Sequence, residues 1–152
     1  MTVLSAQTIR CLTLVHPCCE AFTDNLGNSG GLGPCGYDIT LREAIYVNPH
    51  GFQLVSAVER FAMPDNVVGR VCDKSSLARR AVAVQNTIIE PGWSGYLTLE
   101  VTNHGNGILV MPSGAAIAQV IFEFLDEPTE LPYRGKYQNQ VAGPVSPRDV
   151  RN

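Results

Sequence analysis

The sequence is short of charged residues. Only 16% of its 152 residues are Asp, Glu, Lys or Arg, against a usual share of about 25% in soluble domains. A small domain has a large surface to cover for its volume, so this shortage predicts that part of the surface is buried in an oligomer. The net charge of −3 also lacks the basic excess that would favour a nucleic-acid polymer as partner.

Long apolar runs and an export signal are missing as well. No stretch approaches the roughly 18 consecutive apolar residues of a membrane span, and the first residues do not resemble a signal peptide. The five cysteines are an odd number, and without an export signal they predict reduced thiols rather than disulfides. We therefore expect a soluble, cytoplasmic protein with no membrane partner.

Helical segments are scarce, and we expect one all-β domain over residues 1–152, a sandwich or a barrel. Only residues 75–80 have the composition of a helix, and the Gly- and Asn-rich residues 21–36 predict a loop. Four prolines beyond residue 126 predict a tail, 126–152, that is disordered or lies on a neighbouring subunit. Short segments with alternating polarity predict strands at residues 37–41, 52–58, 67–72, 81–86, 95–103, 108–111 and 115–124.

Two glutamates, Glu90 and Glu100, lie on either side of a predicted turn. Side chains alternate along a strand, so Glu100 shares a polar face with Thr98, opposite an apolar face formed by Leu97, Leu99 and Val101. That polar face is either solvated or the wall of a pocket. Glu90 lies ten residues earlier, and the intervening Pro91-Gly92 favours a turn that lets both carboxylates reach one site.

A second group of residues suits anion binding. Residues 73–80 place two serines beside Lys74, Arg79 and Arg80. A cation and hydroxyls at the start of a helix are suited to phosphate oxygens. Taken alone, the run Ser75 to Arg80 is more often an exposed helical turn.

Taken in order, these segments resemble the dCTP deaminase family of the dUTPase-like superfamily. Lys74 to Arg79 resembles its R-S-S-L-A/G-R motif, Ile89 to Gly95 its I-D-P-G-W/F-x-G, and Leu99-Glu100 its L-E. Further matches are Tyr37 to Leu41 with Y/V-D-L/V-R-L, and Tyr133 with Lys136 to Gln140 for the tail motif Y…K-Y-x-x-Q. Each match is weak alone, but together they keep the family's order from about Gly36 to Arg148.

This resemblance implies a distorted β-barrel or jelly roll with one short helix, assembled as a homotrimer with sites at subunit interfaces. It implies hydrolysis of dCTP to dUTP and ammonia, with Mg²⁺ entering with the triphosphate and without zinc. Glu100 matches the catalytic glutamate, which would move protons between the attacking water, N3 and the leaving amine; such transfer typically contributes about 10²–10⁴-fold. Ser75 and Arg79 match residues that position the water and support that glutamate.

The resemblance also implies a substrate-binding set. Lys74, Ser75 and Ser76 would hold phosphate oxygens, and Glu90 takes the place of an aspartate that contacts the 3′-hydroxyl. The tail would close over the sugar and the triphosphate. The implied substrate-binding residues are Lys74, Ser75, Ser76, Leu77, Ala78, Arg79, Asn86, Thr87, Glu90, Thr98, Leu99, Tyr133, Lys136 and Gln140.

Departures from the family pattern leave other functions open. Lys74 replaces an arginine and loses its bidentate fork, Glu90 replaces a shorter aspartate, and the segment between Arg79 and Glu90, which touches the base in the family, is shortened. The alternatives are a bifunctional dCTP deaminase and dUTPase, a dUTPase, a deaminase of dCMP or a modified cytosine nucleotide, and a non-catalytic nucleotide-binding protein. Against a dUTPase, Glu100 is present and the tail is not Gly-rich.

A zinc deaminase is the remaining alternative. Pro17-Cys18 and Pro34-Cys35 echo part of the signature H-x-E…P-C-x-x-C, but neither cysteine is followed by the required spacing. His16 with Cys18, Cys19 and Cys35 could still bind a structural metal, although such thiols are more often simply buried.

Overall fold

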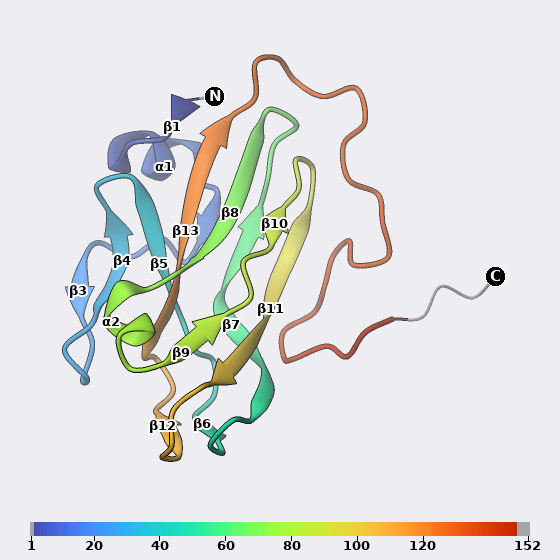
Figure 1. Cartoon of the computed structure of the whole chain (residues 1–152). Coiled ribbons are helices and arrows are strands. Elements are labelled where there is room, and N and C mark those ends of the chain that lie inside the picture. The colour runs from blue at the N-terminus through green and yellow to red at the C-terminus, as the bar shows by residue number, and fades with distance from the viewer. Residues whose placement is uncertain (1, 149–152) are drawn as a thin grey trace.

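The computed structural model describes residues 2–148 and consists mainly of antiparallel β-strands (Figure 1). The larger sheet has the strand order β10-β8-β13-β5-β4-β3, and β1 pairs with β13 outside this path. Its strands are β1 (Thr2–Val3), β3 (Phe22–Thr23), β4 (Ser29–Gly33), β5 (Gly36–Thr40), β8 (Val67–Asp73), β10 (Ile88–Ile89) and β13 (Ala116–Phe124).

A second sheet has the order β2-β7-β11-β9. It comprises β2 (Val15–His16), β7 (Phe52–Ala62), β9 (Val82–Val84) and β11 (Ser94–Asn103), while β6 (Ile45–Val47) pairs with β12 (Leu109–Met111). A single cluster of buried apolar side chains draws on both sheets, including Phe61 and Leu99 from one and Val71 and Phe122 from the other. The expected strands are thus present, and the predicted all-β fold is confirmed.

The pairing of β7 with β11 contains a bulge. Tyr96 is opposite Arg60, but Thr98 is opposite Ser56, so β7 carries two more residues than β11 between these pairs. The extra residues bend β7 locally. Alternation along β11 is preserved, with every second side chain buried from Gly95 to Asn103.

Residues 2–148 contain two helices, so the prediction of one helix is wrong. Helix α2 (Ser75–Ala78) lies in the predicted segment, but α1 (Ala6–Leu12) was not expected. Only Ile9 of α1 is buried, and no side chain caps its start. So short a helix is not stable on its own propensity; its first turn is attached to the barrel by a hydrogen bond from the Ala6 amide to the Pro34 carbonyl.

Residues 21–36 do not form the predicted loop, because β3 and β4 pair within them. Gly30 belongs to this pair for a steric reason: a Cβ at its position would meet the Phe22 ring at 2.3 Å. Glycine within a strand can thus mark a close approach rather than a loop. The turn between the strands is held by Asp24, whose Oδ1 accepts hydrogen bonds from the Leu26 and Asn28 amides.

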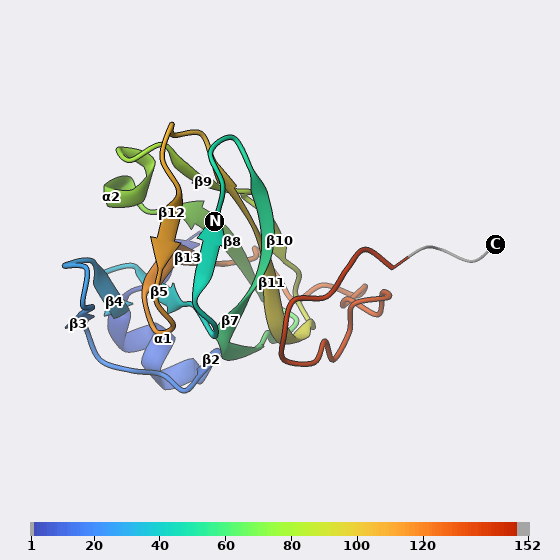
Figure 2. The ribbon, with the colours of Figure 1, turned by 90° about the horizontal axis from the view of Figure 1, so that it is seen from below.

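The proline-rich tail forms no helix or strand within residues 126–148, as predicted. Residues 126–148 pack along β11 of their own chain, which corrects the expected disorder for this part of the tail; a position on a neighbouring subunit stays a prediction. The Tyr96 amide donates to the Gln140 carbonyl, and the Asn139 amide donates to the Ser94 carbonyl. Figures 1 and 2 place this tail and helix α2 on opposite sides of the barrel.

Candidate active site

A cavity of about 540 Å³ lies between β7, β10, β11 and the tail. Its walls are mainly apolar, and two carboxylates open into it. It is lined by Phe52, Leu54, Thr87, Ile88, Ile89, Glu90, Trp93, Leu97, Thr98, Glu100, Tyr133, Tyr137, Gln140, Val145 and Pro147. The size is within the range of about 300–1,000 Å³ found for small-molecule sites.

Glu100 is the central titratable group of this cavity. Strand alternation buries Leu99 and Val101 in the core and turns Glu100 to the other face, so the alternative of a pocket wall is the correct one. Its Oε2 atom is buried without a hydrogen-bond partner. Desolvation by burial raises the pKa of this carboxyl, opposed by a hydrogen bond to its own backbone. A raised pKa suits a carboxyl that gives and takes protons near neutral pH.

The raised pKa also predicts how Glu100 affects stability. An unfolded glutamate titrates near pH ~4.3. Above that pH the folded state binds more protons than the unfolded state, so this residue makes the protein less stable as the pH rises. We expect Glu100→Gln to have a higher melting temperature than the parent protein at pH 7. Below about pH 4 the two melting temperatures should be equal. Thermal unfolding across this range measures the difference; equal melting temperatures throughout would mean an ordinary solvated glutamate.

Glu90, just before the Pro91-Gly92 turn, lines the same cavity as Glu100, and the action of both carboxylates at one site stays a prediction. Gly92 has a φ of 82°, a left-handed conformation that glycine adopts at little cost. A Cβ at Gly92 would also meet Pro132 at 2.7 Å. The turn is therefore fitted to the tail that passes over it.

The tail supplies one wall of the cavity through fixed amide groups. The Gln140 side chain is buried, and its Nε2 atom donates to the Tyr96 carbonyl at 2.9 Å and to Thr98 Oγ1 at 3.0 Å. Further along, the Val145 amide donates to the same Thr98 hydroxyl. The indole of Trp93, which is buried, donates to the Tyr137 carbonyl at 2.8 Å. These bonds hold the tail over the side of β11 that carries Glu100.

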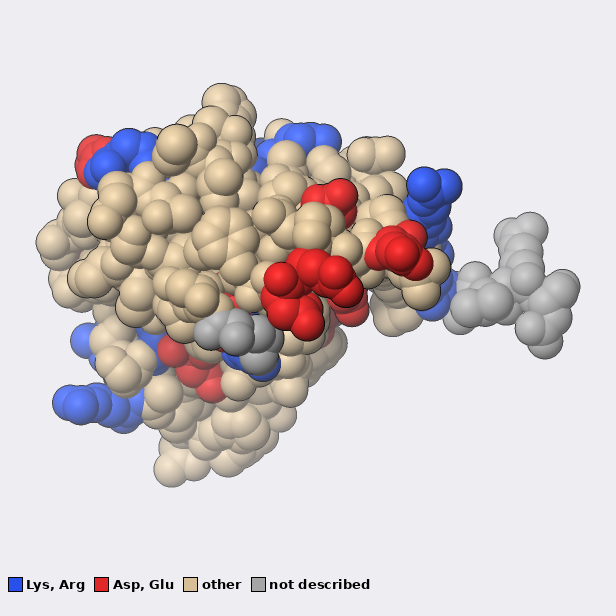
Figure 3. Space-filling model, turned by 90° about the horizontal axis from the view of Figure 1, so that it is seen from above, with Lys and Arg blue, Asp and Glu red and all other residues tan. Residues whose placement is uncertain are grey.

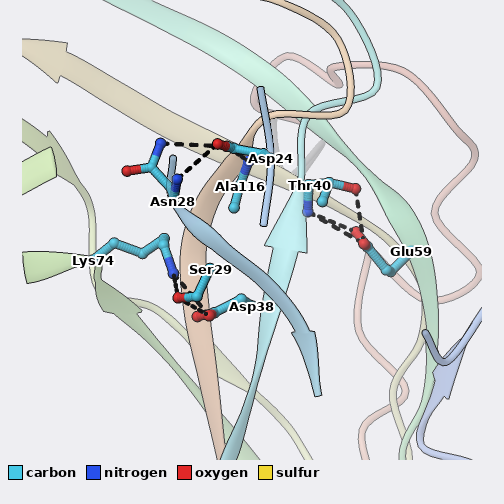
Figure 4. Close-up of polar contacts among 8 residues, drawn as sticks. All are labelled: Asp24, Asn28, Ser29, Asp38, Thr40, Glu59, Lys74 and Ala116. Carbon is cyan, nitrogen blue, oxygen red and sulfur yellow. Dashed lines mark hydrogen bonds and ion pairs between the residues drawn. The ribbon is translucent and has the colours of Figure 1, made fainter. Parts of the chain in front are cut away.

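A second cavity, of about 350 Å³, contains the start of the predicted anion-binding motif. Lys74, Ser29 and Asp38 line it together, and Figure 4 shows the contacts among their side chains. Lys74 Nζ lies 2.8 Å from Asp38 Oδ2, and both side chains are only 6% exposed. The cavity is lined by Gly27, Asn28, Ser29, Asp38, Asp73, Lys74, Ser75, Ser76 and Gln119.

The Lys74 ammonium is therefore already paired. It also donates to Ser29 Oγ at 3.1 Å, and that hydroxyl donates to Asp38 Oδ2 at 2.8 Å. The other carboxylate oxygen, Asp38 Oδ1, is buried without a partner. Lys74 thus attaches the start of α2 to β4 and β5, in addition to any contact it makes with phosphate.

Removing the Lys74 charge should destabilise the fold strongly. Lys74→Met leaves the buried Asp38 carboxylate unpaired, and breaking one partner of a buried ion pair costs about 3–5 kcal/mol. Chemical denaturation gives this loss directly. As the control, Lys74→Met combined with Asp38→Asn should be less destabilised than Lys74→Met alone. A loss below about 1 kcal/mol for the single variant would match a surface ion pair instead.

One chain does not bring the predicted catalytic residues together. Ser75 lines the second cavity and Glu100 the first, and no lining residue is common to both. Arg79 is exposed at the end of α2 and lines neither. Hydrogen bonds at β9 connect residues of both cavities: the Val84 amide donates to Asp73 Oδ1, and the Gln85 amide just beyond this strand donates to the Glu100 carbonyl.

The remaining predicted residues take varied positions. Thr87, Thr98, Tyr133 and Gln140 line the first cavity, whereas Lys136 is exposed beside it. Leu77 and Leu99 are buried in the core, so their side chains contribute packing, and Ala78 is exposed. Asn86 lines neither cavity; with its amide oriented to suit its neighbours, it donates to the Val84 and Val71 carbonyls at 3.2 Å each.

Several lining residues had no assigned role in the sequence analysis. Asp38 belongs to the matched segment Tyr37 to Leu41, which was the available signal. Tyr137 likewise lies within the tail motif. Phe52, Leu54 and Gln119 carry no local signal, because only strand pairing and the path of the chain bring them to the cavities.

The five cysteines are all unpaired, and Cys11, Cys18, Cys19 and Cys35 are exposed rather than buried. Within residues 2–148, no group of three or more His, Cys, Asp or Glu side chains is arranged to hold a metal ion. No helix in the described part of the chain is long and apolar enough to cross a membrane.

Comparison with solved structures defines the fold. The dCTP deaminase from Agrobacterium tumefaciens aligns with a TM-score of 0.68 over 81% of this chain and 49% of that chain, at 16% identity. The native EIAV dUTPase aligns with a TM-score of 0.55 over 66% of this chain and 84% of that chain, at 23% identity. The barrel therefore has the dUTPase-like fold, as predicted.

Sequence comparison then gives the family. The model of the dCTP deaminase-like family matches residues 37–125. A dCTP deaminase from Thermococcus gammatolerans is 34% identical over 135 residues, which cover 79% of this chain and 86% of the relative. One from Rhodospirillum rubrum is 41% identical over 106 residues, covering 66% and 54%. The chain belongs to the dCTP deaminase-like family.

Proposed function

We propose that the protein hydrolyses the cytosine amino group of dCTP, giving dUTP and ammonia. The observation that carries this proposal is Glu100, whose Oε2 atom is buried without a partner in a cavity of about 540 Å³. A carboxyl in such a setting is suited to proton transfer, and it occupies the position of the family's glutamate. Relatives named dCTP deaminase, at 34% and 41% identity, support the choice of substrate.

In the proposed reaction, Glu100 accepts a proton from water as its oxygen attacks C4 of cytosine. The proton passes to N3, which gives a tetrahedral intermediate. Glu100 then takes the proton of the new C4 hydroxyl and delivers it to the amine; the C4–N4 bond breaks, the C4 carbonyl forms, and ammonia leaves. The sum is dCTP plus water giving dUTP plus ammonia, with Glu100 restored. Its raised pKa favours both halves of this transfer.

We further propose that the active unit is a homotrimer in which two chains complete each site. Ser75 and Arg79 lie apart from Glu100 within one chain, and a neighbouring chain would supply them. The rim of the Glu100 cavity is also apolar and open, since Phe52 is 59% and Ile88 46% exposed. Exposed apolar residues around a cavity are typical of a surface that another chain covers.

Magnesium would enter with the triphosphate, and zinc has no part in the proposal. Mg²⁺ is usually bound by one or two carboxylates together with phosphate oxygens and water. The second cavity offers Asp38 Oδ1, which has no partner, and Asp73 beside Ser75 and Ser76. This donor set fits a magnesium nucleotide, with the serine hydroxyls directed to phosphate.

The partners in this proposal are the nucleotide and other copies of the chain, without a nucleic-acid polymer or a membrane. The tail, 126–152, would cover the bound nucleotide. Five unpaired cysteines fit the reducing conditions of the cytoplasm.

A bifunctional enzyme is the second candidate, because Glu90 opens into the same cavity as Glu100. Glu90 would then activate a second water that attacks the α–β phosphate bond of dUTP. The products from dCTP would be ammonia, dUMP and pyrophosphate. This route needs both carboxylates at one nucleotide, which the shared cavity allows.

The substrate and the reaction can be tested together by product analysis. Purified protein with Mg²⁺ is offered dCTP, dCMP, CTP and dUTP separately, and each product is identified by chromatography. We expect dUTP from dCTP and no cleavage of dUTP. Formation of dUMP and pyrophosphate from dCTP would support the bifunctional enzyme. Turnover of dUTP alone, or of dCMP in preference to dCTP, would contradict the proposal.

A further inference from the structure

The end of the described tail folds back on the tail's own middle. Lys136 Nζ donates to the Arg148 carbonyl, and an Arg148 guanidinium nitrogen donates to the Lys136 carbonyl at 2.6 Å. The Arg148 amide also donates to the Tyr137 hydroxyl at 3.2 Å. Residues 136–148 thus form a closed surface loop whose two ends meet.

Two cations share one aromatic ring where this loop closes. Lys136 Nζ lies 5.2 Å and the Arg148 guanidinium carbon 5.7 Å from the centre of the Tyr137 ring. Among residues 2–148, ion pairs within 4.0 Å join Arg10 to Glu20, Arg70 to Glu123 and Lys74 to Asp38, and none includes Lys136 or Arg148. Two adjacent like charges repel, and an anion placed between them would relieve the repulsion.

This pair of cations lies at the rim of the Glu100 cavity. Tyr137, whose ring lies beside both cations, lines that cavity, and so does Pro147, the residue before Arg148. Tyr137 is fixed in place because its carbonyl accepts a hydrogen bond from the Trp93 indole N–H and its amide donates one to the Tyr133 hydroxyl. The cations are thus held by a rigid part of the cavity wall.

The surrounding charge restricts where nucleotide phosphates can lie. The exposed acids Asp65, Asp126, Glu127 and Glu130 belong to two neighbouring turns, which are joined by a hydrogen bond from the Thr129 amide to the Asp65 carbonyl. Figure 3 shows acidic side chains gathered on this end of the molecule, with Lys and Arg side chains near the C-terminal end. Phosphates would be repelled by the acidic surface and attracted to the cations.

We propose that Arg148 acts with Lys136 as a clamp for the phosphate groups of the nucleotide. This inference rests on the proposed function, and it adds a residue that the family's tail motif, ending at Gln140, does not include. The Lys74 ammonium is already paired with Asp38. Other cations are therefore needed to neutralise the charge of the triphosphate. The planar guanidinium of Arg148 suits two phosphate oxygens at once.

The test is equilibrium binding to protein that cannot turn over the ligand. Arg148→Ala is made in the Glu100→Gln background, and calorimetry measures dCTP, dCMP and inorganic tripolyphosphate. Arg134→Ala is the matched control, because Arg134 is exposed in the same tail and its loss changes net charge equally. We expect Arg148→Ala to weaken dCTP and tripolyphosphate binding about tenfold to hundredfold, with less effect on dCMP. Arg148→Lys should restore part of the loss.

Two results would count against the clamp and are distinguishable from failure of the proposed function. Equal dCTP affinity in Arg148→Ala and Arg134→Ala would overturn the clamp and leave the deaminase proposal standing. Absence of dCTP binding in every variant would reject the proposed substrate. In that case binding of tripolyphosphate tests the clamp separately. Its affinity must still fall in Arg148→Ala if the two cations bind phosphates.

Discussion

Glu100→Gln is expected to abolish most ammonia release from dCTP, lowering kcat by at least about 10²–10⁴-fold. The amide keeps the size of the side chain, but it cannot accept a proton from water and return it to the leaving amine. Affinity for dCTP should stay within a few-fold of the parent protein, because the cavity wall is unchanged. Coupled ammonia detection gives kcat, and calorimetry gives the affinity.

Glu90→Gln serves as the comparison variant, because Glu90 lines the same cavity and has no part in the proposed deamination chemistry. Its kcat for deamination should fall much less than that of Glu100→Gln. If a dUTPase step exists, Glu90→Gln should instead stop dUMP formation from dCTP. Near-normal ammonia release by Glu100→Gln would reject this glutamate as the proton carrier.

Coexpression of Glu100→Gln and Arg79→Ala chains should restore activity that neither variant has alone. In a ring of three chains, a site is intact when its Glu100 comes from one variant and its Arg79 from the other. Random assortment gives about one quarter of the parent activity. The reason is structural: the two residues belong to separate regions of one chain, with Glu100 lining a cavity that Arg79 does not reach.

Arg80→Ala is the control for this experiment, since Arg80 is also exposed and directly follows Arg79. Alone, it should keep most of the activity. Mixed trimers are verified by native mass spectrometry before the assay. If mixed trimers form and remain inactive, Glu100 and Arg79 act within one chain or not in the same site, and the proposed assembly is wrong.

The sequence was informative wherever the deciding interaction is local. Alternation along residues 95–103 placed Glu100 on the face opposite Leu99, and the structure has this arrangement. The Pro91-Gly92 turn likewise predicted that Glu90 would approach Glu100, and both line one cavity. Both inferences depend on the geometry of one strand or one turn, which neighbouring residues determine.

The sequence was less informative where distant segments meet. Lys74 pairs with Asp38, 36 positions earlier in the chain, and this pairing depends on β5 and β8 both pairing with β13. The tail was expected to be disordered or on a neighbour, because its prolines exclude a regular element. It is held by separate hydrogen bonds to β11, such as those of Gln140, which leave no periodic signal.

A buried carboxylate in β7 illustrates the same limit. Glu59 is 3% exposed and accepts hydrogen bonds from the Thr40 amide and hydroxyl (Figure 4). Desolvation raises its pKa, opposed by those bonds from Thr40. Alternation along β7 places Glu59 on the buried face with Ala57 and Phe61. It does not identify the partner, because Thr40 belongs to β5 in the other sheet.

The stoichiometry of ammonia released from dCTP by the parent protein tests the proposed deamination most directly. Ammonia, dUTP and pyrophosphate are measured in the same reaction over time. We expect one ammonia for each dUTP formed, no pyrophosphate, and loss of both products in Glu100→Gln. Pyrophosphate without ammonia, or ammonia release that does not depend on Glu100, would contradict the proposed deamination.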